Sequence, residues 1–392
     1  LQKTYLPFRA KTNWWQNGFS VFAISFSIST PLLFSGLYHK EGIGGLWLIW
    51  SGFIISGFLP FVFAPLWAKL NFITDNQFIL FRFSGISAKI LHQFRAIYVG
   101  LFIVAFLISF QVLSLQKVIT FYTGWDKDKS LMILAFFLVL IAFKNQLSSN
   151  IRLDNFHVLF ILLIFLASLI VMFYNGGGYN QAVSFLSKVS PKSLDIFPEN
   201  KAYLFVLFFI QTWSVQLFDG SGIDAQRYFS QKNKKHVWKI AVLSTILHFA
   251  FALILVLILV HGNSQFYSYE LYDKELYILY YLNKSVGTWL GAFLFIAFMS
   301  CFVTSFLGLL NWGASFLSID VYRTYVNKKA SEKSLNFVAK FSSLLITVLS
   351  VVFVYFSSSL EILIKLLFSI SAGVAPVFIL RWFWLRINAW SQ

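Results

Sequence analysis

Small and hydroxyl-bearing side chains repeat along one side of the apolar stretch MSCFVTSFLGLLNWGASFLSIDVY. The residues in this pattern are Ser300, Cys301, Thr304, Ser305 and Gly308. No water satisfies a stray hydroxyl inside a membrane, so polar groups at this spacing need a partner. Hydroxyls about one turn apart beside a free carbonyl offer the oxygen ligands of a hard cation such as Na⁺. Close helix packing through small residues is the alternative interpretation.

The composition places this stretch in a membrane protein. The chain has 392 residues, of which 58% are hydrophobic and only 12% are charged, whereas a soluble protein needs more polar surface. The net charge of +16 comes from bases scattered between apolar runs, which argues against a nucleic-acid-binding patch. Cys301 is the single cysteine, so a disulfide framework and a cysteine metal cluster are excluded. The six histidines lack ligand spacing, and we interpret them as structural or loop residues.

Ten apolar segments approach the length that spans a bilayer, which predicts an all-α integral membrane protein with one transmembrane domain, residues 1–392. The predicted spans are 14–37, 44–66, 94–116, 131–143, 153–174, 203–219, 238–260, 288–318, 338–356 and 360–385. They divide into two five-helix repeats, residues 14–174 and 203–386. The sixth span begins on the side opposite the first, so the repeats have inverted topology, as in many secondary transporters. Both chain ends look truncated.

The distribution of basic residues predicts the orientation. Most of the 31 Lys and Arg residues fall on one side of the predicted spans, and cytoplasmic loops carry the excess of positive charge. We therefore expect residues 1–13 and the loops that contain Arg227 and Lys328 to be cytoplasmic. The expected location is the inner membrane of a bacterium, where the chain would be a multi-pass protein.

Two further segments predict interrupted helices. Pro31 follows SFSIST, lacks an N–H group and disfavours helix at Thr30. A helix broken near the bilayer midplane exposes carbonyls that can bind ions or solute, whereas a simple proline kink is the alternative. Gly220 and Gly222 should interrupt the helix that ends near Asp219. Asp219 could line a pathway or cap this break.

Asp154, in NIRLDNF, lies at the predicted entrance of the fifth span. An ionisable residue there suggests a transport pathway, while pairing with Arg152 or capping of the helix is the structural alternative. The sequence contains no Walker, Rossmann or nucleophile-elbow motif and no carboxylate pair suited to hydrolysis. We therefore expect neither an enzyme nor an ATP-driven pump.

Several motifs, in order along the chain, resemble those of the sodium:solute symporter family, whose fold is of the leucine-transporter (LeuT) type. They are WWQNGFSVFAISFS, ITDNQFILFRFSG, RLDNFHV, DGSGIDAQRYFSQKNKKH, SIDVY and APVFILRWFWLRINAW. The resemblance covers essentially the whole chain, and the DGxGxxAQR loop and LRWFWxRINAW helix end suggest a particular branch. It implies Na⁺-coupled symport of a small organic solute by alternating access, with the lipid bilayer as surroundings and no nucleic-acid partner.

The resemblance also implies which residues bind the ion. It places backbone carbonyl ligands of Na⁺ at Ala23, Phe26 and Cys301, and side-chain ligands at Thr304 and Ser305. Asp154 matches an aspartate on the sodium exit route, which lies near a second sodium in some members of the family.

The solute pocket resembles that of the family's sugar transporters less well. Ser221 and Gly222 stand near the position of their substrate amide, so we do not expect a hexose. Polar and aromatic residues of the predicted core helices are the candidates for the pocket. They are Ser27, Ser29, Thr30, Trp47, Trp50, Gln111, Gln211, Trp213, Gln216, Ser369 and Ser371.

Two alternatives remain open from the sequence. A transporter-like sensor or accessory membrane subunit would keep this fold without transport. H⁺ coupling, with Asp154 as the proton carrier, would replace sodium coupling and predicts uptake that depends on pH in sodium-free buffer.

Overall fold

A computed structural model describes residues 12–56, 59–70, 72–144, 151–214, 219–371 and 374–391. All of the regular elements within these ranges are helical, and one isolated bridge pairs Thr12 with Gln231. The all-α fold class expected from the sequence is therefore confirmed.

The described residues of the N-terminal half form ten α-helices, with short 3₁₀ or π segments between some of them. The α-helices are α1 (Trp14–Ser25), α2 (Ser29–Glu41), α3 (Trp47–Ser56), α4 (Ala64–Lys69), α5 (Gln77–Arg82), α6 (Gly85–Ile97), α7 (Val104–Thr123), α8 (Lys127–Lys144), α9 (Ile151–Gly176) and α10 (Gly178–Val189). The short segments are η2 (Ile43–Leu46), η3 (Leu59–Phe63), η4 (Tyr98–Ile103) and η5 (Pro191–Leu194).

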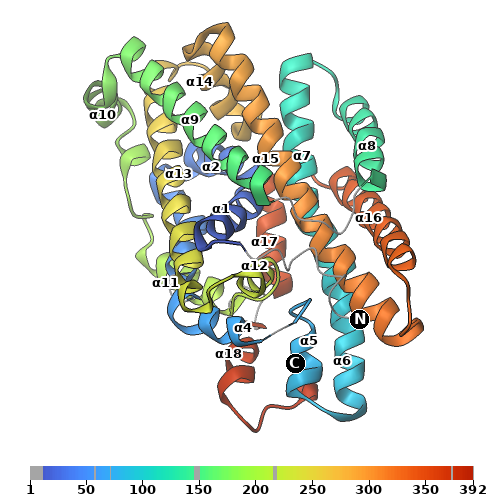
Figure 1. The fold of residues 1–392 in the computed structure, drawn as a ribbon. Coiled ribbons are helices and arrows are strands. Elements are labelled where there is room, and N and C mark those ends of the chain that lie inside the picture. Colours follow the sequence, from blue (N-terminus) through green and yellow to red (C-terminus); the bar gives the residue numbers. More distant parts are fainter. Residues whose placement is uncertain are drawn as a thin grey trace.

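The C-terminal half has the longest helices. Its α-helices are α11 (Lys201–Ser214), α12 (Ile223–Ser230), α13 (Trp238–Gln265), α14 (Tyr277–Ser285), α15 (Gly287–Ser315), α16 (Glu332–Tyr355), α17 (Leu360–Ser371) and α18 (Val374–Phe383). The short segments are η6 (Lys234–His236), η7 (Lys274–Leu276), η8 (Phe316–Val326) and η9 (Ala389–Ser391). Figure 1 shows α10 and α14 at one end of the helical bundle and α12 and α18 at the other.

Five helical stretches among the described residues are long and apolar enough to cross a membrane. They are Gly85–Thr123, Leu153–Gly176, Lys234–Gln265, Gly287–Val326 and Glu332–Tyr355. These stretches coincide with five of the predicted spans, and the bent pair of α1 and α2 supplies a sixth. The remaining predicted spans fall on α3, α8, α11 and the pair α17 and α18. The chain is a multi-pass membrane protein.

The first predicted span is a broken helix. The axes of α1 and α2 differ by 56°, and Phe26 ends α1 in an extended conformation. The predicted position of the break was wrong by a few residues, because Thr30 already lies in the first turn of α2 and its N–H donates to the Ser27 carbonyl at 3.0 Å. Pro31 is tolerated there because N–H groups of a first turn have no helical acceptor.

The second predicted break is confirmed at the glycines. Residues 219–222 form turns between α11 and α12, and Gly220 and Gly222 have φ values of +70° and +76°. These values lie in the left-handed region, which glycine adopts without steric cost. Residues 215–218, immediately before the turns, lie outside the described part of the chain.

Helix α1 lies in the middle of the bundle, where it packs against α9, α13 and α15 (Figure 1). Aromatic rings fill this contact: Phe251 of α13 lies 5.0 Å from the ring of Phe22 and 4.7 Å from that of Phe26. Phe165 of α9 and Phe298 of α15 extend the same cluster, with ring centroids 5.6 Å apart. Close packing of this kind holds membrane helices together, since lipid offers little hydrophobic driving force.

Candidate functional site

The break between α1 and α2 exposes backbone oxygens inside the bundle. The last carbonyls of a helix have no helical N–H donor, and those of Ala23 and Phe26 belong to this group in α1. Both residues are buried, with exposed fractions of 4% and 3%. Unpaired carbonyls this deep in a membrane protein need a hydrogen-bond donor or a cation.

Helix α15 brings its hydroxyl residues to the same region. Gly308 packs directly on Ile24 of α1, because a β-carbon at position 308 would lie only 2.7 Å from the Ile24 side chain. One turn before Gly308, Thr304 and Ser305 are buried in α15, and Cys301 is fully buried another turn before them. The missing side chain of Gly308 therefore lets the hydroxyl-bearing face of α15 approach the end of α1.

Each of the two hydroxyls has a partner on a third helix. The Ser305 hydroxyl donates to the Cys301 carbonyl at 2.7 Å or to the side-chain oxygen of Gln111, in α7, at 2.9 Å. Thr304 Oγ1 contacts Nδ1 of His157, in α9, and donates to the Ser300 carbonyl at 2.9 Å. The oxygen cluster is thus enclosed by α1, α7, α9 and α15.

The sequence interpretation predicted neither of these contacts. Gln111 was assigned to the solute pocket, and in the structure its buried side chain contacts Ser305. His157 was grouped with the structural histidines, although it lies in RLDNFHV, one of the motifs that carried the family resemblance. Its place in that motif was the signal that could have identified it.

Asp154 joins three helices at the α12 end of the bundle. Its Oδ2 accepts a hydrogen bond from Ser20 of α1 at 2.5 Å and lies 3.9 Å from the guanidinium of Arg227, in α12. Arg227 Nε also donates to the Ser20 hydroxyl at 2.9 Å. Arg227 was expected in a loop, but it lies in α12 with an exposed fraction of 3%. An arginine in a membrane domain needs an acidic partner, and Asp154 is that partner.

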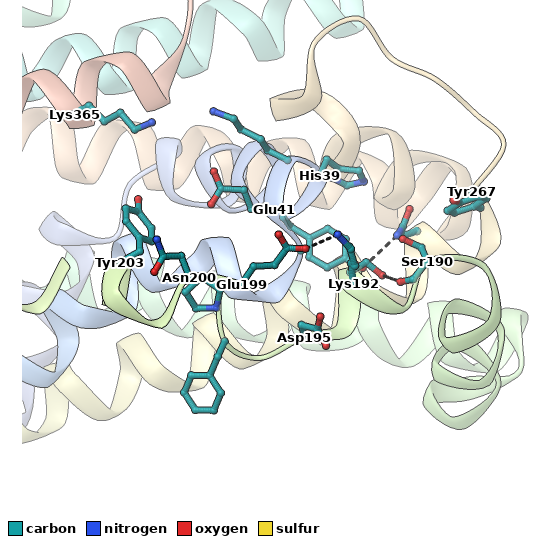
Figure 2. Close-up of a pocket in the computed structure, with 17 residues that line it drawn as sticks. His39, Glu41, Ser190, Lys192, Asp195, Glu199, Asn200, Tyr203, Tyr267 and Lys365 are labelled. Carbon is teal, nitrogen blue, oxygen red and sulfur yellow. Dashed lines mark hydrogen bonds and ion pairs between the residues drawn. The ribbon is translucent and has the colours of Figure 1, made fainter. Parts of the chain in front are cut away.

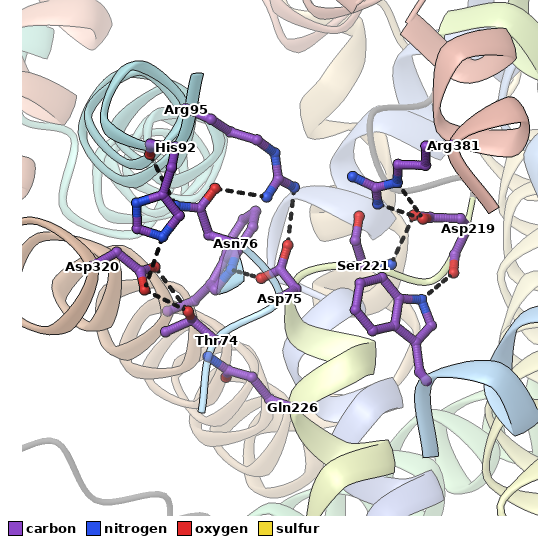
Figure 3. A network of polar contacts seen from close by, with 12 residues as sticks. Thr74, Asp75, Asn76, His92, Arg95, Asp219, Ser221, Gln226, Asp320 and Arg381 are labelled. Carbon is purple, nitrogen blue, oxygen red and sulfur yellow. Dashed lines mark hydrogen bonds and ion pairs between the residues drawn. The ribbon is translucent and has the colours of Figure 1, made fainter. Parts of the chain in front are cut away.

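Asp219 is held in a second buried ion pair, shown in Figure 3. Arg381 of α18 donates to its Oδ2 through Nε at 3.1 Å and through Nη2, and Trp382 Nε1 donates to the same oxygen at 2.7 Å. Asp219 Oδ1 accepts the N–H of Ser221 at 3.2 Å. Of the two alternatives for Asp219, the cap of the break is the one that these contacts support.

A third polar group in Figure 3 connects two of the motifs that carried the family resemblance. Thr74, from ITDNQ, donates to the carboxylate of Asp320, from SIDVY, at 2.8 Å. The neighbouring Asp75 accepts from Arg95 of α6 at 2.9 Å. These buried contacts fasten the segment before α5 to α6 and to the end of the α15 span.

The residues expected in the solute pocket are only partly brought together. The hydroxyls of Ser27 and Ser29 lie 2.5 Å apart at the break between α1 and α2. Trp47 and Trp50, in α3, form an edge-to-face pair, and Trp47 Nε1 donates to the Ile196 carbonyl at 2.8 Å. Ser369 is exposed and donates to the Lys365 carbonyl of its own helix. The side chains of Gln211, Trp213, Gln216 and Ser371 lie outside the described part of the structure.

A cavity of about 810 Å³ opens at the opposite end of the bundle from Asp154. Its lining, shown in Figure 2, combines both signs of charge and comes from the end of α2, the segment 190–200, α11, α17 and the C-terminal end of α13 with the residues after it. Charged lining residues include Glu41, Lys192, Glu199 and Lys365. The hydrogen bond from Lys192 keeps the pKa of the exposed Glu199 carboxyl below its ordinary value, so both groups are charged at neutral pH. The sequence analysis did not predict this cavity.

No group of three or more His, Cys, Asp or Glu side chains in the described ranges could hold a metal ion. The hydroxyl and carbonyl oxygens at the α1–α15 contact instead suit a weakly bound hard cation, which is coordinated by oxygen.

Comparison with known proteins identifies the class to which this arrangement belongs. The model of the sodium:solute symporter family matches residues 8–390. The chain is also similar to a solved structure described as the substrate-bound outward-open state of a Na⁺-coupled sialic acid symporter with a novel Na⁺ site. The sequences are 15% identical, the TM-score is 0.79, and the match covers 98% of this chain and 82% of the other. No curated protein matches the chain.

Proposed function

The chain belongs to the sodium:solute symporter family, and from this premise we propose that Na⁺ binds where the broken first helix meets α15. The protein is a Na⁺-coupled symporter, and its family consists of transporters rather than enzymes. The proposed ligands are the carbonyls of Ala23, Phe26 and Cys301 and the hydroxyls of Thr304 and Ser305. A single observation supports this set: Gly308 packs on Ile24 and brings the buried hydroxyls of α15 to the open end of α1.

Sodium at this position would bridge α1 and α15, while the two halves of the broken first span are fastened at separate ends of the bundle. At the α12 end, α1 is held by the contact of Ser20 with Asp154 and Arg227. At the opposite end, α2 is held because the Ser35 hydroxyl donates to the Lys274 carbonyl at 2.9 Å. We propose that the two contacts open alternately and that Na⁺ favours the state in which α1 stays against α15. An ion shifts such an equilibrium only through different affinities for the two states.

For Asp154 we propose a role on the sodium exit route rather than as the ligand of a second sodium. Its Oδ2 already accepts from Ser20, and the nearby Arg227 guanidinium repels an additional cation at this carboxylate. The contact lies on α1, the helix that also carries Ala23 and Phe26, so its opening would release the ion toward the α12 end.

A small organic solute would bind beside the ion at the break. The buried N-terminus of α2 and the hydroxyls of Ser27, Ser29 and Thr30 offer hydrogen-bonding groups there. Trp50, in α3, is a further candidate, because its indole N–H is buried without a hydrogen-bond partner within the described residues. An unsatisfied donor in this environment gains free energy when a polar solute accepts from it.

We infer that the α12 end faces the cytoplasm. The basic residues Lys232, Lys234 and Lys235 follow α12, and Lys328 and Lys329 follow the α15 span. Positive residues concentrate in cytoplasmic connections, and the inner membrane of a bacterium is the proposed location. The cavity at the other end would then open to the outside.

The solute can be identified by thermal stability. The purified full-length protein is heated with a library of small solutes in NaCl and, separately, in KCl of equal concentration. A ligand that binds only the folded state raises the free energy of unfolding, by an amount that grows with the logarithm of its concentration above the Kd. Stabilisation by one solute only in NaCl would identify a coupled substrate. Equal stabilisation in both salts by every active solute would contradict binding beside the ion.

A further inference from the structure

The side-chain oxygen of Gln111 reaches Ser305 from a helix that takes no part in the proposed sodium site. Gln111 lies in α7 and has an exposed fraction of 3%, and its Oε1 is 2.9 Å from the Ser305 hydroxyl. The two residues are 194 positions apart in the sequence, so this contact exists only in the folded protein.

The Ser305 hydroxyl has one hydrogen and two lone pairs. The hydrogen can point to the Cys301 carbonyl, 2.7 Å away in the same helix, or to Gln111. When the Ser305 hydrogen points to the Cys301 carbonyl, it occupies an oxygen that is itself a proposed Na⁺ ligand and places partial positive charge beside the cation. When it points to Gln111, the Cys301 carbonyl stays free to bind the ion, and the lone pairs of the Ser305 oxygen point away from α7.

We propose that Gln111 is a positioning residue that accepts the Ser305 hydrogen when sodium binds and so sets the affinity of the site for Na⁺. This inference rests on the proposed sodium site and names a residue that acts through Ser305 without touching the ion. It also assigns Gln111 a role different from that of the solute pocket. The Gln111 amide is buried and stays uncharged whichever way the Ser305 hydrogen points.

The test compares the sodium concentration that gives half-saturation in equilibrium binding of radioactive Na⁺ to the purified full-length protein, with choline chloride keeping the ionic strength constant. Gln111→Leu preserves the approximate volume but removes the acceptor. The expected result is that the midpoint for Na⁺ rises about tenfold, the equivalent of one ordinary hydrogen bond, while the amount of Na⁺ bound at saturation is retained. An unchanged midpoint in folded Gln111→Leu protein would overturn the proposal.

Gln116→Leu is the matched control. Gln116 is also buried in α7, but its amide donates to Thr120 of the same helix at 2.9 Å and has no bond to α15. This variant should keep the wild-type sodium midpoint. If Gln111→Leu fails to fold, Gln111→Glu serves instead, because it keeps an acceptor at the same reach and should leave the midpoint unchanged or lower. A higher midpoint in Gln111→Glu would contradict the proposal.

Ser305→Ala separates this inference from the proposed function. If Ser305→Ala raises the sodium midpoint and Gln111→Leu does not, the site stands and only the role of Gln111 is refuted. If neither variant changes the midpoint, the proposed site itself is refuted. If the proposed site and the role of Gln111 are both correct, the double variant Gln111→Leu with Ser305→Ala should bind Na⁺ no more weakly than Ser305→Ala alone, because the two residues act through one hydroxyl.

Discussion

Lys117 and Glu275 form a buried ion pair that joins α7 to the segment before α14. Lys117 Nζ lies 2.7 Å from Glu275 Oε2 and 2.6 Å from Asp273 Oδ2. The other oxygen of Glu275 accepts the backbone N–H of Leu360, at the start of α17, at 2.8 Å. Glu275 also packs against Gly36 of α2, where a β-carbon would come within 2.9 Å of its Cγ. The Glu275 side chain therefore connects its own segment η7 with α2, α7 and α17, at the end of the bundle that carries the cavity.

Glu275→Ala should strongly destabilise the folded protein. The change removes the acceptor of the Leu360 N–H and one of the two acidic partners of Lys117. Breaking a buried ion pair on one side costs about 3–5 kcal/mol. The free energy of unfolding, measured by denaturant titration in detergent, should fall by an amount in this range. Glu199→Ala at the exposed Lys192 pair is the control and should show no measurable change.

Asp154→Asn should make the protein open more often at the α12 end. The variant keeps an oxygen that accepts from Ser20 but loses the charge that faces Arg227. Weakening of the charge-assisted bond from Ser20 together with loss of the ion pair with Arg227 should shift the opening equilibrium about tenfold. Cys301, the single cysteine and fully buried, reports this opening through its rate of labelling by a maleimide in sodium-free buffer.

The exposed Asp195 at the other end of the bundle provides the control for this measurement. Asp195→Asn should label at the wild-type rate. Asp154→Asn protein that labels no faster than wild type would show that the contact with Ser20 does not close the exit route.

His157→Ala should weaken sodium binding because Thr304 loses its partner on α9. The sodium concentration at half-saturation, measured by equilibrium binding of radioactive Na⁺, is expected to rise by about tenfold, as for loss of one hydrogen bond. His157→Gln restores a polar group of similar reach and should recover most of the affinity. If folded His157→Ala protein binds Na⁺ as tightly as wild type, the contact with Thr304 is irrelevant to the ion.

Asp219→Asn should lower stability without altering the response to sodium. The variant leaves the Arg381 guanidinium, which is fully buried, without its counter-charge. Thermal unfolding should occur at lower temperature in both NaCl and KCl. The sodium midpoint of the folded fraction should match wild type, because Asp219 caps the break rather than lining the ion route. A shifted midpoint would restore the pathway interpretation of this residue.

The sequence predicts the fold well where the physical signal is local. Apolar length identified the long spans, and Gly220 and Gly222 marked the turns before α12 because only glycine adopts their backbone conformation easily. Pro31 indicated the broken first helix but not the position of the break, since a proline in a first turn is as acceptable as one just before a helix. The five-plus-five repeat remains a prediction.

Side-chain partners from distant segments were harder to predict. Arg227 was expected in a cytoplasmic loop, and periodicity does not say that Arg227 and Arg381 pair with Asp154 and Asp219. Gln111 was assigned to the solute because a polar group in an apolar helix signals a site without naming its occupant. The choice between ion and solute required the contact with Ser305, which depends on how α7 packs against α15.

The double variant Thr304→Ala with Ser305→Ala tests the proposed sodium site most directly. Equilibrium binding of radioactive Na⁺ to the purified full-length protein needs no knowledge of the solute, and Thr347→Ala with Ser350→Ala in α16 is a control for loss of two buried hydroxyls. The account predicts that the double variant stays folded and loses saturable Na⁺ binding while the control keeps it. Wild-type Na⁺ affinity in the folded double variant would contradict the account.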